Sequence, residues 1–132
     1  MSDHAIVPSG EATDFMADYE GFGEMRSFTN ELGAEQVAFT WRVMPPGTGG
    51  KGSYGHRHNE QEEIYFVVSG NVLFKLGDDV IEVGPKTAVR VPADVFRSVH
   101  NDGPEEAELV ICSVKGDGAA TGPDLTQDFW PD

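Results

Sequence analysis

Residues 50–70, GKGSYGHRHNEQEEIYFVVSG, hold the pattern on which the prediction of the fold depends. Successive side chains of a β-strand point to opposite faces, so His56 and His58 share one face, about 7 Å apart. Their imidazoles can converge on one ion at about 2.1 Å. Residues 59–62 can turn the chain, so that a strand starting near Glu63 runs back alongside and presents its carboxylate. His56, His58 and Glu63 are therefore predicted to bind a divalent metal ion with open coordination positions.

Other interpretations of this region remain open. The two histidines can also be exposed or core residues without a metal, and a one-residue slip makes Glu62 the ligand in place of Glu63. The glycine-rich loop before them is not predicted to bind phosphate, because Lys51 is followed by Gly52 and not by Ser or Thr at the start of a helix.

The flanking sequence predicts an all-β domain. A strand is expected over residues 36–44, QVAFTWRVM. The runs EIYFVVSG and NVLFKL meet at residues 69–71, which predicts a tight hairpin because Gly and Asn accept positive φ. Short strands then continue to AELVICSV without a 3.6-residue apolar repeat. An antiparallel sandwich or barrel with little helix is therefore expected.

The spacing of this region is similar to the first motif of the cupin superfamily. The matching residues are Gly50, His56, His58, Glu63 and Gly70. The resemblance implies a jelly-roll, double-stranded β-helix barrel.

A second stretch resembles the second cupin motif through Gly84, Pro92 and Asn101. It departs from that motif at two positions. Asp94 stands in place of the internal glycine, and Arg97 stands where the family usually has its fourth metal ligand, a histidine.

The resemblance also implies the organisation of the chain. We expect a single cupin domain over residues 1–132, with the barrel core at about 36–114. Residues 1–35 would form an N-terminal arm and residues 115–132 a C-terminal tail. Phe129 and Trp130 in the tail are costly to leave in water, so they are expected to pack on the barrel or on a partner subunit.

Arg97 decides between two forms of the site. A guanidinium has no acceptor and a pKa above about 12, so it cannot bind a cation and repels one nearby. His100 is a poor substitute, because three residues along a strand it faces the other way. Either a metal is held by three ligands and Arg97 contacts an anionic substrate, or Arg97 pairs with Glu63 and the cavity binds a small anionic molecule without metal.

Each form implies a different function. The first is a metal-dependent enzyme acting on a small molecule, such as an oxygenase or isomerase, with Fe, Mn, Ni or Zn as cofactor. The second is a non-enzymatic small-molecule-binding or sensory cupin. Arg97, Tyr65 and Trp41 are the candidate substrate-binding residues, with core packing as the alternative for Tyr65 and Trp41. No catalytic residue is assigned, because the fold does not choose the reaction.

Composition limits the partners. The 132 residues include 23 acidic and 9 basic ones, and the formal charge of −14 repels nucleic acid and anionic membranes. No apolar run approaches the roughly 20 residues of a membrane span, and the N-terminus lacks the pattern of a signal peptide, so a cytoplasmic protein is expected.

The lone Cys112 is expected to be a buried apolar residue. The resemblance implies a homodimer that pairs through sheet edges.

Overall fold

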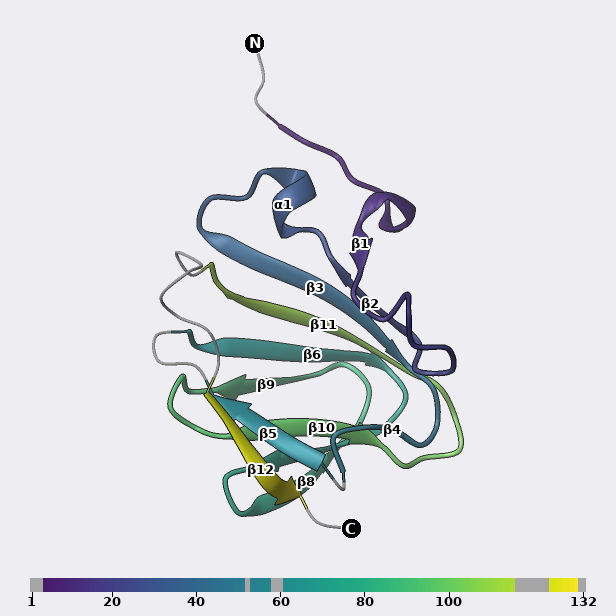
Figure 1. Cartoon of the computed structure of the whole chain (residues 1–132), viewed down its shortest axis with the longest axis vertical. Helices are drawn as coiled ribbons and strands as arrows, with labels where there is room; N and C mark the ends of the chain where they lie inside the picture. The colour runs from purple at the N-terminus through teal and green to yellow at the C-terminus, as the bar shows by residue number, and fades with distance from the viewer. Residues whose placement is uncertain (1–3, 52, 58–60, 116–123, 131–132) are drawn as a thin grey trace.

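The structure, a computed structural model, describes residues 4–51, 53–57, 61–115 and 124–130, with the backbone alone for 53–57 and 124–128. The strands form two antiparallel sheets of a jelly roll, which confirms the predicted all-β fold (Figure 1). No helix in these ranges is long and apolar enough to cross a bilayer.

The first sheet has the strand order β1-β2-β3-β11-β6-β9, and the second has the order β12-β5-β10-β7-β8, with β4 paired to β10. Their bounds are β1 Thr13–Asp14, β2 Glu24–Ser27, β3 Val37–Met44, β4 Thr48–Gly49, β5 Ser53–Arg57, β6 Glu63–Ser69, β7 Val72–Leu76, β8 Asp79–Val83, β9 Thr87–Val91, β10 Arg97–Asn101, β11 Ala107–Val114 and β12 Asp124–Trp130. Two short helical turns, η1 (Ser9–Glu11) and α1 (Thr29–Leu32), precede β3.

The core lies between the two sheets. In β6 the side chains of Glu63, Tyr65 and Val67 are buried, whereas those of Ile64 and Phe66 point outward, as the alternation of a half-buried strand requires. The Tyr65 ring packs edge-on against the Phe74 ring of the opposite sheet, with centroids 5.2 Å apart. The buried apolar cluster takes members from both sheets: Met44, Tyr65, Val67, Val72, Phe74, Val83, Val91, Val99, Ala107, Leu109 and Ile111.

The hairpin predicted at residues 69–71 is wrong. Among the described residues, β6 pairs with β11 and β9, whereas β7 pairs with β10 and β8. Gly70 does adopt a positive φ of 80°, but the turn carries the chain from one sheet to the other. A Cβ at this position would lie 2.8 Å from the Ala107 Cα, so the crossing is too tight for another residue. The residue types of a turn predict that the chain changes direction sharply, but they do not predict which strand pairs with which in the sheet.

The predicted pairing of the histidine strand with the glutamate strand is also wrong. β5, which carries His56, pairs with β10 and β12 of the second sheet, and β6, which carries Glu63, belongs to the first. A loop between two strands can join facing sheets as readily as neighbouring strands of one sheet. Any convergence of these residues must therefore occur across the barrel interior.

Both ends of the chain join the sheets. In the first sheet β2 lies between β3 and the edge strand β1, and in the second sheet β12 pairs with β5 as the edge strand. Trp130 is only 4% exposed and packs edge-on against His100, while Phe129 lies against Phe96 and under the Lys75 ammonium. The two aromatic residues of the tail therefore pack on the barrel of their own chain.

Asn101 fixes the end of β10. Its buried amide donates to the carbonyl oxygens of Met44, at 2.9 Å, and Glu105, at 2.8 Å, and its Oδ1 accepts from the Gly103 amide at 3.0 Å. These three hydrogen bonds satisfy groups that would be costly to bury unpaired. They hold β10 between β4 and β7, with Val99 facing the interior.

Candidate ligand pocket and its charged cluster

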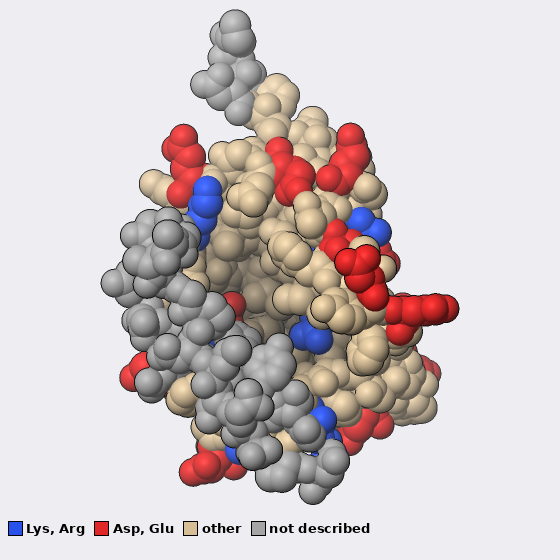
Figure 2. All heavy atoms as spheres, in the orientation of Figure 1, with Lys and Arg blue, Asp and Glu red and all other residues tan. Residues whose placement is uncertain are grey.

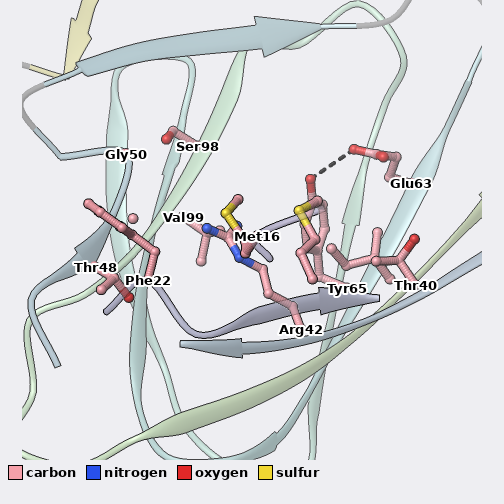
Figure 3. Close-up of a pocket in the computed structure, with 13 residues that line it drawn as sticks. Met16, Phe22, Thr40, Arg42, Thr48, Gly50, Glu63, Tyr65, Ser98 and Val99 are labelled. Atoms are coloured by element: carbon pink, nitrogen blue, oxygen red, sulfur yellow. Dashed lines mark hydrogen bonds between the residues drawn. The ribbon is translucent and has the colours of Figure 1, made fainter. Parts of the chain in front are cut away.

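A pocket of about 300 Å³ opens at one end of the barrel. Figure 2 shows a hollow in this face of the molecule, with basic and acidic side chains visible at it. Elements from both sheets contribute to the wall (Figure 3). The lining residues are Met16, Phe22, Met25, Thr40, Arg42, Thr48, Gly49, Gly50, Glu63, Tyr65, Ser98, Val99 and Ile111.

Glu63 and Tyr65 form a hydrogen-bonded pair in the pocket wall. They share the inner face of β6, and the Tyr65 hydroxyl donates to Glu63 Oε1 at 2.8 Å (Figure 3). Burial, followed by the adjacent Glu63 carboxylate, raises the pKa of Tyr65 well above its usual value, although the charges of Arg97 and Arg42 act in the opposite direction. The Tyr65 hydroxyl therefore stays protonated at neutral pH and acts as a donor.

Arg97 approaches the same carboxylate from β10. The side chain is 1% exposed, and its Nη1 lies 3.8 Å from Glu63 Oε1. Its Nη2 donates to the carbonyl oxygen of Pro92 at 2.6 Å, while Nε and Nη1 have no hydrogen-bond acceptor among the described residues. Arg97 is not one of the residues that line the pocket, and it contacts the pocket through Glu63. The contact is an ion pair without a hydrogen bond, so part of the donor capacity of Arg97 remains unused within the described region.

The three predicted metal ligands are described to different extents. The backbone of His56 lies in β5 directly opposite Arg97 in the ladder, but the His56 side chain and the whole of His58 fall outside the described residues. Within the described part, no group of three His, Cys, Asp or Glu side chains is placed to hold a metal ion. The described side of the site supplies one carboxylate, Glu63, with a guanidinium beside it.

The two alternative ligands, Glu62 and His100, lie apart from Glu63 in the structure. Glu62 is half-exposed and pairs with the exposed Arg90, so Glu63 is the carboxylate that faces the interior. His100 faces away from Val99 and packs against Trp130. Neither Glu62 nor His100 is therefore placed to join Glu63 at the pocket.

Trp41 does not line the pocket, contrary to the expectation that it binds substrate. Thr40 and Arg42 line it, so the residue between them points to the other face of β3. There the Trp41 indole donates to Glu108 Oε1 at 2.7 Å. The charged residue of the pocket wall is instead Arg42, which was not predicted as a site residue. Its position inside the apolar run VAFTWRVM is the feature of the sequence that could have indicated a role in the site. Its guanidinium projects among the lining side chains (Figure 3).

Met16 and Phe22 were also missed. They belong to the segment between β1 and β2, which the sequence analysis treated only as an N-terminal arm. No periodic pattern in this glycine-rich, acidic segment indicates that it reaches the barrel, because the contact depends on how β2 pairs with β3.

Comparisons with known proteins agree with this architecture. A family model described as the cupin domain matches residues 40–113. No curated protein matches the chain in sequence.

Three solved structures are similar to this chain over most of its length. The polyketide cyclase RemF from Streptomyces resistomycificus has a TM-score of 0.72 at 17% identity, covering 95% of this chain and 85% of that chain. A cupin protein from Bacteroides fragilis has a TM-score of 0.70 at 17% identity, covering 90% of both chains. A Thermotoga maritima protein described as a predicted oxalate decarboxylase has a TM-score of 0.66 at 20% identity, covering 83% of this chain and 98% of that chain.

At these sequence identities, the similarity to the three structures shows that the fold is shared. It does not assign the functions of those proteins to this chain. The match to the family model extends from β3 to β11 and includes Glu63, Tyr65 and Arg97. The chain belongs to the cupin domain family.

Proposed function

We propose that this cupin binds a small anionic molecule, with a carboxylate as the group recognised, in the pocket between its sheets. The observation that carries the proposal is the presence of two guanidinium groups at the pocket. Arg42 lines the pocket, and Arg97 Nη1 lies 3.8 Å from the carboxylate of the lining residue Glu63. These basic groups occur in a chain whose formal charge is −14.

The two arginines contribute in different ways. Arg97 is buried beside Glu63, so the two opposite charges attract each other where little water screens them. Arg42 lies in the pocket wall, close enough for its charge to act on the Tyr65 hydroxyl. A planar guanidinium can donate two parallel hydrogen bonds to a carboxylate, which supplies both affinity and orientation.

The Glu63–Tyr65 pair gives the site a proton acceptor next to a proton donor. Proton transfer to or from a bound acid is the reaction class that these two residues can serve.

Replacing Arg42 by Gln removes the charge from the pocket wall and keeps a polar side chain of related shape. We expect the affinity for propionate, measured by isothermal titration calorimetry, to fall by about tenfold or more, since a hydrogen bond to a charged group contributes about 1.5–3 kcal/mol. Arg90→Gln is the matched control, because Arg90 is exposed and paired with Glu62. Undetectable propionate binding by the native protein, or equal affinities of the native and Arg42→Gln proteins, would contradict the proposal.

A second candidate function is a metal-dependent enzyme whose ion is held by His56, His58 and Glu63. The favouring observation is that Arg97 lies opposite His56 in the strand ladder and also reaches Glu63, which brings the backbone of the histidine strand and the carboxylate to one region. The Arg97 guanidinium, 3.8 Å from Glu63, repels a cation placed there, so a site formed by His56, His58 and Glu63 would have reduced affinity. A bound Fe, Mn, Ni or Zn ion would act as a Lewis acid on an oxygen ligand.

The metal candidate is tested by elemental analysis of protein purified without a chelating tag. Arg97→His replaces the repelling charge with a ligand, so we expect it to raise metal occupancy severalfold, and His58→Ala to abolish the occupancy. An occupancy that is unchanged or lower in Arg97→His would count against this site. Metal-free native protein that still binds propionate would leave the anion pocket as the function.

We further propose that the protein forms a homodimer through the outer face of the first sheet. Apolar side chains cross this face in rows, since Phe39 pairs with Cys112 and Cys112 with Ile64. The members that are at least one-third exposed are Val37, Phe39, Ile64, Phe66 and Val114. A second copy of the same face would cover these side chains and remove them from water.

Introducing a charge in the centre of this face should separate the subunits. Phe66→Lys is expected to convert a dimer into a monomer in light scattering coupled to size exclusion, because a lysine would be buried against an apolar partner. Val80→Lys serves as the control, since Val80 is 52% exposed on β8 of the other sheet. A native protein that remains monomeric across a concentration series would refute the dimer.

A further inference from the structure

The segment between β1 and β2, residues 15–23, extends to the ligand pocket. Its residues Met16 and Phe22 line the pocket together with Met25 of β2. In Figure 3 the Met16 and Phe22 side chains share the cavity with the Arg42 guanidinium and the Tyr65–Glu63 pair. The pocket therefore combines charged side chains from the barrel strands with apolar side chains, of which Met16 and Phe22 come from the N-terminal segment.

Local hydrogen bonds hold this segment in place. The Asp14 carboxylate accepts from the Met16 amide at 2.9 Å and from the Met25 amide at 3.0 Å, so one side chain positions both pocket methionines. The Phe15 amide donates to the Met25 carbonyl oxygen at 2.8 Å and closes the base of the loop.

The far end of the segment fits closely against β3. Gly23 has a φ of 81°, and a Cβ there would lie 2.1 Å from the Val43 carbonyl oxygen. Only glycine allows this approach. The segment is thus anchored at both ends, and Met16 and Phe22 lie between the anchors.

The apolar side of the pocket is incompletely covered. Phe22 is 53% exposed although it lines a cavity, and Met16 and Met25, which also line the cavity, are partly exposed. Exposed aromatic surface at a pocket mouth favours a partner that removes it from water. Methionine side chains adapt to irregular shapes and make favourable contacts with aromatic rings. A short dicarboxylate would satisfy the charges but leave this apolar surface in water.

We propose that the segment of residues 15–23 makes the pocket selective for monocarboxylates with an apolar, aromatic body. The carboxylate lies at Arg42, and the apolar body packs against Phe22 and the methionines. The inference rests on the proposed anion-binding function and specifies the class of ligand. The cavity of about 300 Å³ is at the lower end of the range for small-molecule sites, which suits a single ring with a short acid side chain.

Isothermal titration calorimetry of the full chain with 3-phenylpropionate and propionate tests the selectivity. We expect 3-phenylpropionate to bind at least about tenfold more tightly, because its ring buries apolar surface that propionate lacks. The double variant Met16→Gln/Phe22→Ala should bring the two affinities to within about threefold, because it removes the apolar contacts that the ring of 3-phenylpropionate makes. Phe15→Ala is the control, since Phe15 is 57% exposed in the same segment but is not a lining residue. Circular dichroism and thermal melting establish that each variant is folded.

The outcomes separate this inference from the function on which it rests. Equal affinities of the native protein for the two acids, or a preference that survives in the double variant, would overturn the selectivity and leave the anion pocket standing. Loss of the preference in Phe15→Ala as well would show a general effect of the segment and would also overturn it. If neither acid binds the native protein, the proposed function fails first.

Discussion

The site depends on one buried charge contact, between the Glu63 carboxylate of β6 and the Arg97 guanidinium of β10. These strands belong to different sheets, so the contact joins the two halves of the barrel beside the pocket. Removing two charges from water is costly, and here the cost is offset by their attraction, by the Tyr65 hydroxyl on Glu63 and by the Pro92 carbonyl on Arg97. Because the pair lies at the pocket, it also sets the local charge that a ligand meets.

The jelly roll explains how distant residues meet there. β3, β6 and β11 present alternate residues to the interior, so Arg42, Tyr65 and Ile111 point into one cavity although they are far apart in sequence. β10 faces them with Val99, and the N-terminal segment adds Met16 and Phe22. Charged and apolar side chains therefore line one cavity, which suits an acid with an apolar body.

Local patterns predicted the parts of this structure that depend on alternation. The strand expected over residues 36–44, the inward direction of Glu63 and Tyr65, and the opposite directions of Arg97 and His100 follow from the two-residue period. Long-range pairing was not predictable in this way. The turn at Gly70 crosses between sheets, Trp41 faces outward while Arg42 faces inward, and Met16 reaches the pocket only through the pairing of β2 with β3. The side chains of His56 and His58 lie outside the described residues, so their prediction as metal ligands is untested.

A double-mutant cycle of Glu63→Gln and Arg97→Met, followed by urea unfolding in the presence of a chelator, tests the central contact most directly. If the two groups form a buried pair, each single variant leaves an uncompensated charge and should lose about 3–5 kcal/mol of unfolding free energy. The double variant should then lose less than the sum, with a coupling free energy of about 1–3 kcal/mol. Additive losses, with a coupling below about 0.5 kcal/mol, would contradict the contact and the account of the site built on it.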